Sequence, residues 1–319
     1  MCSQRVAHGV IILNVRRLLT AGLAALLVAA CGSTTGTGLP SNASLTASPS
    51  ATASPAATAS IDPTPTSAAS EAIETTRPPA WQLVAVGDSI FYNSPNDCPG
   101  CTSAVDRYAE AVTAATGRQV NVRNLSEHNG LQLAGLLREL ERDVTRIDAL
   151  TNADIILVGI AHNDAPMNRD DDPCDGAGGE FPDWSKFTAA CIAEDVATYT
   201  PLYESAFEQI AALRAGKPTI LRTLNRFNDW IGWPGHDLTA EGIAATSAVV
   251  AAWNEMICGA AEPHGFVCAD IGSQFNGVDG TEPANDLLAA DYTHPSEKGN
   301  KVIAQVLIDL GFEPLADAP

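Results

Sequence analysis

Leu83-Val84-Ala85-Val86-Gly87-Asp88-Ser89-Ile90 joins an apolar run to a glycine turn that carries a serine. Four successive apolar residues predict a buried strand, which ends at the glycine. A hydroxyl just past the carboxyl end of such a strand can meet a substrate and a general base. Gly-Asp-Ser also forms ordinary turns, so the serine gains meaning only from the rest of the chain. Asp88 is expected to shape the turn and not to act as an acid.

Alternating strands and helices predict the fold class. Apolar segments at 82–86, 120–125, 154–159, 218–224 and 265–271 are typical of strands. Helical periodicity appears at roughly 103–116, 131–143, 192–215, 239–261 and 296–310. This alternation predicts a parallel sheet covered on both faces. The expected fold is α/β, a three-layer α/β/α sandwich with a five-stranded parallel sheet.

The first 30 residues have the features of an export signal. Arg16 and Arg17 precede an apolar run over 18–30 that is too short to span a bilayer. The run ends in Leu27-Val28-Ala29-Ala30-Cys31, which resembles the lipobox of bacterial lipoproteins. That resemblance implies cleavage before Cys31 and lipidation of its thiol and new amino terminus. An ordinary secretory signal is the alternative. We expect an extracytoplasmic protein, lipid-anchored to the bacterial cell membrane or secreted.

Composition divides the remainder into a linker and one domain. Residues 31–80 are dominated by Ser, Thr, Ala, Pro and Gly, which predicts a disordered, flexible tether. Residues 81–319 suffice for one α/β domain. The 38 acidic and 18 basic side chains argue against nucleic acid or an anionic membrane surface as a direct partner. We expect a monomer that contacts the membrane only through its lipid anchor.

Six cysteines remain when Cys2 and Cys31 are set aside. An even number in an exported chain favours disulfides, for which 15 connectivities exist. Pairing sequence neighbours is the simplest choice and predicts Cys98–Cys101, Cys174–Cys191 and Cys258–Cys268.

Polar residues follow two more predicted strands and also precede the last predicted helix. The second strand leads into Asn124-Leu125-Ser126-Glu127-His128-Asn129-Gly130, and the third into Gly159-Ile160-Ala161-His162-Asn163-Asp164. Asp291-Tyr292-Thr293-His294-Pro295 lies just before the last helix. An acid three residues before a histidine can hold one ring nitrogen and fix the tautomer. With the serine, these groups form the inventory of a serine esterase.

Taken in order, these blocks resemble the SGNH hydrolases, also called the GDSL esterase/lipase family, over nearly all of residues 82–312. The blocks are Gly87-Asp88-Ser89-Ile90, then Gly130, then Gly159 with Asn163, and finally Asp291 with His294. The resemblance implies the flavodoxin-like SGNH hydrolase fold and ester hydrolysis without a cofactor or a metal.

The same resemblance assigns roles to five residues. It implies Ser89 as the nucleophile, His294 as the general base and Asp291 as the acid that orients the imidazole. The backbone N–H groups of Ser89 and Gly130 and the side-chain amide of Asn163 would form the oxyanion hole. Donors already in place stabilise the negative charge that develops on the carbonyl oxygen.

Two blocks depart from the usual pattern. Glu127-His128-Asn129 is bulkier than the small residues that the family usually has before its glycine, which weakens the assignment of Gly130. His162 stands directly before Asn163 and adds a second imidazole near the site. We interpret His162 as a solvated loop histidine, with substrate binding as the alternative.

Two other segments invite functional interpretations. Trp230 and Trp233 lie in a loop that could line a groove for a carbohydrate ester, whereas Trp253 falls within a predicted helix and is expected in the core. The acidic segment 170–176 suggests calcium, but its spacing misses the EF-hand pattern. A solvated acidic loop held by Cys174 is the preferred interpretation.

The sequence thus predicts an extracytoplasmic serine esterase that hydrolyses carboxylic esters through an acyl-enzyme on Ser89. Its substrate would be a small-molecule or glycan ester, namely a lipid, aryl or acylated-carbohydrate ester. One alternative is an exported thiol–disulfide oxidoreductase that uses Cys98 and Cys101, because a Cys-x-x-Cys at a helix start can lower a thiol pKa. The other is a non-catalytic glycan-binding module with the same fold.

Overall fold

The computed structural model describes residues 79–315, apart from 165–173, 175–182 and 236. The chain separates into two units, Met1–Glu71 and Ala72–Pro319, and the described residues all belong to the second. The predicted export signal, the lipidation site Cys31 and the linker therefore lie outside the described residues, apart from Pro79 and Ala80 at the end of the linker. The acidic loop 170–176 also lies outside them, except for Cys174.

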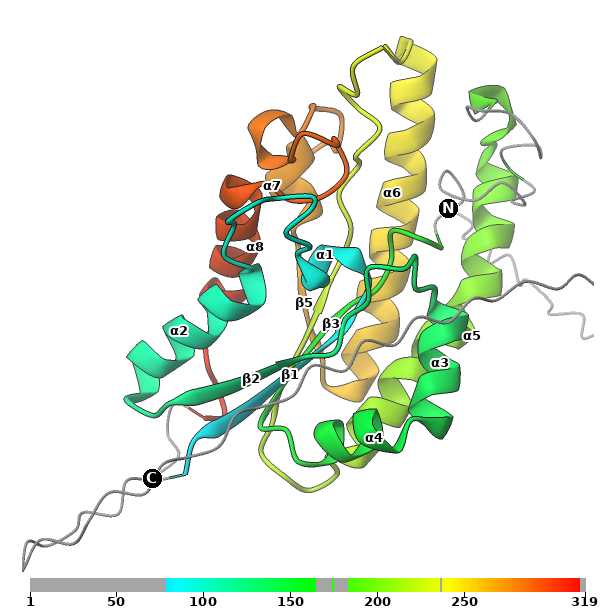
Figure 1. The fold of residues 1–319 in the computed structure, drawn as a ribbon. Coiled ribbons are helices and arrows are strands. Elements are labelled where there is room, and N and C mark those ends of the chain that lie inside the picture. Colours follow the sequence, from blue (N-terminus) through cyan, green and yellow to red (C-terminus); the bar gives the residue numbers. More distant parts are fainter. Residues whose placement is uncertain (1–78, 165–173, 175–182, 236, 316–319) are drawn as a thin grey trace, which may run out of the picture. The chain divides into compact units, whose positions relative to one another are not determined.

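Five parallel strands form a single sheet in the order β2-β1-β3-β4-β5 (Figure 1). The strands are β1 Trp81–Gly87, β2 Val120–Asn124, β3 Ile155–Gly159, β4 Ile220–Leu224 and β5 Val267–Ala269. All five lie where the sequence predicts them. The central strand β3 is buried throughout, while β2 at one edge is largely exposed. The glycines that end β1 and β3 are paired in register, so the loops after these strands start side by side.

Helices cover both faces of the sheet, which confirms the predicted three-layer sandwich (Figure 1). Alternate residues of each strand point to opposite faces. Val84 and Val86 pack with α3 Leu133–Arg142, α4 Val144–Thr151, α5 Ala189–Leu213 and α6 Ala240–Ala261. Leu83 and Ala85 pack with α2 Ala104–Thr116, α7 Gly272–Asn276 and α8 Glu297–Asp309.

Three α-helices are additional to the five that the sequence predicts. The one-turn helix α1 Ser89–Tyr92 starts at the serine itself. The short α4 follows α3 without a loop, because Asp143 ends α3 and its side chain accepts hydrogen bonds from Thr145 N and Arg146 N. Helix α7 follows β5. Single 3-10 turns are present at Trp184–Lys186, Glu262–His264 and Asn285–Leu287.

The predicted cysteine pairs are brought together as disulfides. The Cα–Cα distances are 5.5 Å for Cys98–Cys101, 5.7 Å for Cys174–Cys191 and 5.3 Å for Cys258–Cys268. All three lie in the range that a disulfide requires. The first pair lies in the loop between α1 and α2, beside the turn that carries the serine.

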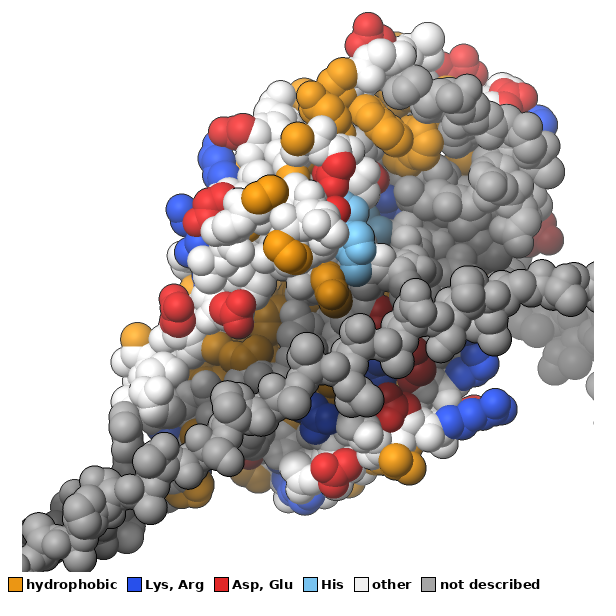
Figure 2. All heavy atoms as spheres, in the orientation of Figure 1, with side chains coloured by type: hydrophobic (Ala, Val, Ile, Leu, Met, Phe, Trp, Pro, Cys, Tyr) orange, Lys and Arg blue, Asp and Glu red, His pale blue; other side chains and the backbone are white. Residues whose placement is uncertain are grey.

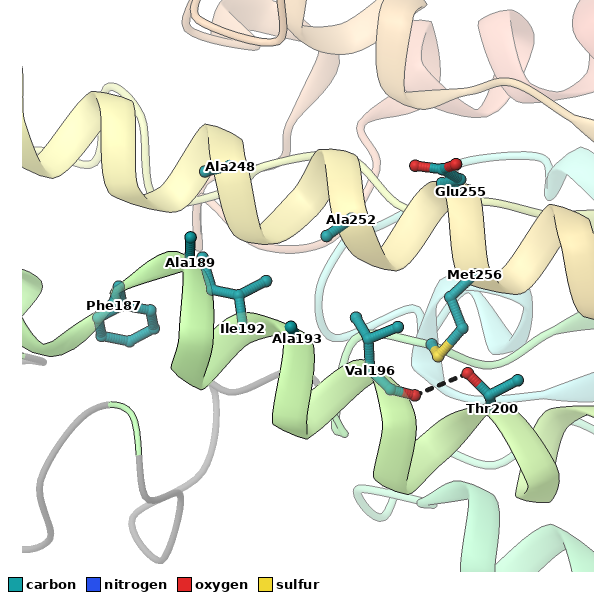
Figure 3. Close-up of a pocket in the computed structure, with 10 residues that line it drawn as sticks. All are labelled: Phe187, Ala189, Ile192, Ala193, Val196, Thr200, Ala248, Ala252, Glu255 and Met256. Carbon is teal, nitrogen blue, oxygen red and sulfur yellow. Dashed lines mark hydrogen bonds between the residues drawn. The ribbon is translucent and has the colours of Figure 1, made fainter. Parts of the chain in front are cut away.

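Helices α5 and α6 lie side by side, with an apolar groove between them (Figure 3). Its lining includes Phe187, Ile192 and Val196 on the α5 side and Met256 on α6. The segment Ala240–His264 is long and apolar enough to cross a membrane by length and composition. Its inner face, however, packs into the core, where Trp253 is completely buried as predicted. This burial is typical of the core helix of a globular domain.

Candidate active site

The serine turn is built on a close approach between two strand ends. Gly87 has φ +156°, and a Cβ atom there would lie 1.9 Å from the carbonyl oxygen of Gly159. The next residue, Asp88, donates its backbone N–H to that same oxygen at 2.8 Å. Only glycine fits between the two backbones. Ser89 then begins α1, so its N–H is one of the first-turn amides that the helix itself leaves without a partner.

The Asp88 side chain stabilises the turn through hydrogen bonds to backbone N–H groups. The carboxylate is buried and accepts hydrogen bonds from the backbone N–H groups of Ile90 at 3.0 Å and of Ala161 and His162 at 3.1 Å each. Burial raises the pKa of Asp88, while these N–H groups and the charge of Arg226 oppose that shift. Asp88 therefore caps α1 and ties it to the loop after β3, which is the structural role predicted for it.

Asn163 is fixed by the loop that contains Gly130. Its side-chain Nδ2 donates to the carbonyl oxygen of Leu131 at 3.0 Å. Its backbone carbonyl oxygen accepts from Gln132 Nε2 at 3.1 Å. A side-chain amide carries two N–H groups, and the hydrogen bond to Leu131 uses one of them. Gly130 adopts φ +77° at the turn just before, a conformation that favours glycine. The structure thus joins the second and third blocks of the sequence.

The acid and the histidine of the last block form a hydrogen-bonded pair. His294 Nδ1 lies 2.7 Å from Asp291 Oδ2, and the other carboxylate oxygen accepts from the backbone N–H groups of Thr293 and His294 at 3.1 and 3.0 Å. Partial burial alone would raise the pKa of Asp291, but the hydrogen bonds from His294 and Thr293 outweigh it and lower the pKa. The carboxylate is therefore charged at neutral pH. A charged carboxylate in this position favours the tautomer of His294 that carries its proton on Nδ1.

Asn300 connects the histidine loop to α1. This side chain lies on α8 and is completely buried. Its amide nitrogen donates to Asn93 Oδ1 at the end of α1 (2.9 Å) and to the carbonyl oxygen of Pro295 (3.2 Å). Its oxygen accepts from Ala104 N at the start of α2 (2.9 Å). The sequence analysis missed Asn300. Its position on the stripe of α8 that also contains Ile303, Ala304 and Leu307 was the available signal, because that stripe is buried.

The side chains of Asp97 and His128 lie beside His294. Asp97 Oδ2 lies 3.5 Å from His294 Nδ1 and 2.7 Å from His128 Nε2, and the two imidazole rings are 5.5 Å apart. Figure 2 shows histidine side chains gathered on one face with acidic side chains beside them. Asp97 was not singled out from the sequence, since it follows no predicted strand. His128 was noted only for its bulk.

The prediction that His162 is a solvated loop histidine is wrong. Asp88 holds the backbone of this loop inward, and the His162 ring is buried against Phe227 with 4.5 Å between ring centroids. Burial lowers the pKa of His162 well below its usual value, and the positive charge of Arg226 lowers it further. His162 is therefore neutral near pH 7. Its contact with substrate stays a prediction.

A buried ion pair that was not predicted from the sequence lies in the loop after β4. Arg226 Nη2 is 3.2 Å from Asp229 Oδ1, and both side chains are almost completely inaccessible to solvent. Burial raises the pKa of Asp229, which the charge of Arg226 opposes. Both residues follow β4 at the sheet edge where the other blocks meet, and that placement was a signal in the sequence.

The tryptophans of the loop after β4 form an aromatic cluster. Trp230 is buried, with its ring centroid 5.6 Å from that of Trp184 and 5.3 Å from that of Trp233. Trp233 is partly exposed. Substrate contact by Trp230 or Trp233 stays a prediction.

Comparisons with known proteins identify the family of this chain. Residues 85–302 match the GDSL-like Lipase/Acylhydrolase family. No curated protein matches the sequence at a significant level. A solved lipase from a goat rumen metagenome is 16% identical, with a TM-score of 0.58, covering 74% of this chain and 100% of its own. This likeness shows the fold.

Two other solved structures are similar at lower scores. An extracellular lipase from Streptomyces rimosus is 20% identical, with a TM-score of 0.46, over 72% of this chain and 98% of its own. A variant of an acetyl xylan esterase from Geobacillus stearothermophilus is 17% identical, with a TM-score of 0.47, over 74% and 96%. Neither score is high enough to carry weight here. The match over 85–302 covers more than half of the sequence, and the chain therefore belongs to the GDSL-like lipase/acylhydrolase family and is an ester hydrolase.

Proposed function

We propose that this protein is an extracytoplasmic serine esterase in which Ser89 is the nucleophile and His294 the general base. The observation that carries the proposal is the 2.7 Å hydrogen bond from His294 Nδ1 to Asp291, in a loop that Asn300 ties to the helix beginning at Ser89. A serine hydroxyl is a weak nucleophile unless a base removes its proton. Asp291 supplies the tautomer that such a base needs.

The reaction has two halves. Ser89 Oγ attacks the carbonyl carbon of the ester while His294 Nε2 takes the hydroxyl proton. The tetrahedral intermediate collapses, the C–O bond to the alcohol breaks, and His294 returns the proton to the leaving oxygen. Water then attacks the acyl-enzyme while His294 takes its proton. The C–O bond to Ser89 breaks, His294 returns the proton to Ser89 Oγ, and the acid is released.

The oxyanion would be stabilised by three donors. These are the N–H groups of Ser89 and Gly130 and the second N–H of the Asn163 amide. The support is positional: α1 leaves the Ser89 N–H unused, and Leu131 anchors Asn163 by one hydrogen only. Donors that are already fixed need no reorganisation during the reaction, and each is typically worth about 3–4 kcal/mol of barrier.

Location and substrate class rest on the sequence. The leader with its lipobox-like Leu27-to-Cys31 segment supports export and lipid anchoring at Cys31, and the three disulfide-compatible pairs suit an oxidising compartment. We propose a lipid, aryl or acylated-carbohydrate ester as substrate. Palmitate labelling of wild-type and Cys31→Ser protein tests the anchor. If Cys31 is lipidated, only the wild-type protein should become labelled.

Replacing the nucleophile is the decisive experiment. Ser89→Ala should lower hydrolysis of short p-nitrophenyl esters by about 10³-fold or more, because no other group forms the acyl-enzyme. Its far-UV circular dichroism and melting temperature should match the wild type. A fluorophosphonate should add one adduct to the wild type, mapped to Ser89 by mass spectrometry. Wild-type activity in Ser89→Ala would overturn the assignment.

A further inference from the structure

We propose that Asp97, His128 and His294 form a Zn²⁺-binding site whose occupation switches the esterase off. Each residue offers one ligand atom, and the three atoms all lie within 4.8 Å of one another. The site shares His294 with the proposed catalytic pair but also uses two side chains that ester hydrolysis does not need. The inhibitory consequence rests on the proposed function, whereas the binding of the metal does not.

The distances suit a small metal ion. Zn²⁺ binds nitrogen and oxygen ligands at about 2.0–2.2 Å, so two ligands of a tetrahedral ion are about 3.3 Å apart. Asp97 Oδ2 is 2.7 Å from His128 Nε2 and 3.5 Å from His294 Nδ1. The first distance must lengthen by about 0.6 Å and the second is already close to the required value. The third pair, His128 Nε2 and His294 Nδ1, lies within 4.8 Å and must close by side-chain rotation.

The donor set and its exposure also favour zinc. Two imidazole nitrogens and one carboxylate oxygen suit zinc, and a fourth position would be left for water. Side-chain exposures of 37% for His128, 15% for Asp97 and 19% for His294 give an ion access from solvent. The carboxylate of Asp291, 2.7 Å from His294 Nδ1, adds a second negative charge beside the cation.

Occupation would inhibit because it changes the tautomer of His294. Catalysis requires the ring proton on Nδ1, donated to Asp291, and a lone pair on Nε2. A metal bound to Nδ1 requires the lone pair there, so the proton moves to Nε2 and the hydrogen bond to Asp291 is lost. An Nε2 that carries a proton cannot take one from Ser89. No proton is released overall, because the neutral ring keeps its single proton.

The arrangement around His294 Nδ1 also exceeds what catalysis needs. One nitrogen carries one proton, yet two carboxylates approach it, Asp291 at 2.7 Å and Asp97 at 3.5 Å. Asp291 alone satisfies that proton. The second carboxylate and the imidazole that it contacts, His128, are accounted for by an ion held between them.

Binding can be measured without catalysis. Titration calorimetry of ZnCl₂ into full-length Ser89→Ala protein should show a site that disappears in Ser89→Ala/His128→Gln. His264→Gln in the same background is the matched control, because His264 lies in a 3-10 turn after α6 and belongs to no group of potential metal ligands among the described residues. It should keep the site. Equal zinc binding in the His128→Gln and control proteins would overturn the proposal.

Inhibition provides the second test. ZnCl₂ should inhibit wild-type hydrolysis of p-nitrophenyl acetate, and EDTA should restore it. His128→Gln should keep its basal rate within about twofold and raise the zinc concentration for half-inhibition at least tenfold, as expected for loss of one metal ligand. Asp97→Asn should shift it in the same direction. Unchanged zinc sensitivity in both variants would contradict the proposal. A protein without esterase activity that still binds zinc through His128 would refute the proposed function but keep the metal site.

Discussion

The two halves of the candidate site are built in different ways. The inner half consists of the Gly87-to-Ser89 turn and the loop 161–164, which are joined by buried hydrogen bonds between Asp88 and backbone N–H groups. The outer half consists of Asp291 and His294, which form a hydrogen bond through partly exposed side chains. The proposed nucleophile thus has a rigid setting, whereas the proposed base is positioned by a carboxylate that solvent reaches.

The difference separates stability from reactivity. Buried polar groups that lose their partners cost about 1–3 kcal/mol each, so changes in the inner half should weaken the fold. Exposed ion pairs are worth about 0–1 kcal/mol, so changes in the outer half should leave stability nearly intact. Changes in the outer half should instead alter the rate, because the hydrogen bond from Asp291 determines the tautomer and the orientation of His294.

The largest effect is expected from Asp291→Asn in the outer half. Its amide no longer selects the Nδ1 proton of His294, so kcat should fall by about 10³–10⁴-fold. The free energy of unfolding should change by less than about 1 kcal/mol. Steady-state kinetics and urea unfolding measure the two quantities. Asp286→Asn is the control, because Asp286 is exposed and pairs with Lys298; it should keep the rate. A large loss of stability in Asp291→Asn would break the comparison.

Gly87→Ala tests the inner half. The new methyl group would meet the carbonyl oxygen of Gly159 at 1.9 Å, so the two strand ends must separate. We expect Gly87→Ala to lower the free energy of unfolding by about 3–4 kcal/mol and to lose esterase activity. Gly117→Ala serves as the comparison, because its Cβ meets nothing within 4 Å and only its φ of +69° resists the change. Similar losses in the two variants would show that the close approach to Gly159 is not the cause.

Asn300→Ala removes the connection between the halves. The partly buried side-chain oxygen of Asn93 and the buried N–H of Ala104 would lose their partner, so we expect about 2–3 kcal/mol of destabilisation. Activity should fall as well, because the histidine loop is no longer tied to α1. Gln305→Ala on the exposed face of the same helix should be nearly neutral. Full activity at full stability in Asn300→Ala would remove this residue from the positioning of His294.

The smallest effect concerns pH. The pKa of Asp291 in the folded protein lies below its ordinary value of 3.8, so its charge stabilises the folded state above that value. This contribution is lost as the pH falls through the folded pKa. The difference in unfolding free energy between wild type and Asp291→Asn should stay constant from about pH 7 to 5 and shrink below about pH 4. The side chain is 35% exposed, so the difference should remain below about 1 kcal/mol. A difference that grows on acidification would contradict the lowered pKa of Asp291.

Most of the fold follows from the chain because its signals are local. The strand at 82–86 and the helix at 103–116 have periodicities that survive in the structure, and neighbouring cysteines were enough to suggest the disulfides. Helix α4 was missed because the pattern at 131–143 continues into it, and only the capping by Asp143 separates the two.

The site was predictable where sequence spacing is short and not where contacts are distant. Asp291 and His294 are three residues apart, so their pairing follows from local geometry. Asp97 and His128 are 31 residues apart and meet only through the fold. His162 was misplaced because a backbone anchored by Asp88 turns the ring inward, and no local pattern reports such an anchor.

The bond between Asn93 and Asn300 has a consequence for the order in which activity appears. It joins residues 207 positions apart, so it forms only when the last helix has reached the rest of the domain. Contacts of such long range are costly to close and tend to form late. A chain still emerging from the ribosome, or cut before α8, would lack the tie between the loop of His294 and the helix that begins at Ser89. We therefore expect hydrolytic activity to appear only after α8 has packed against the rest of the domain.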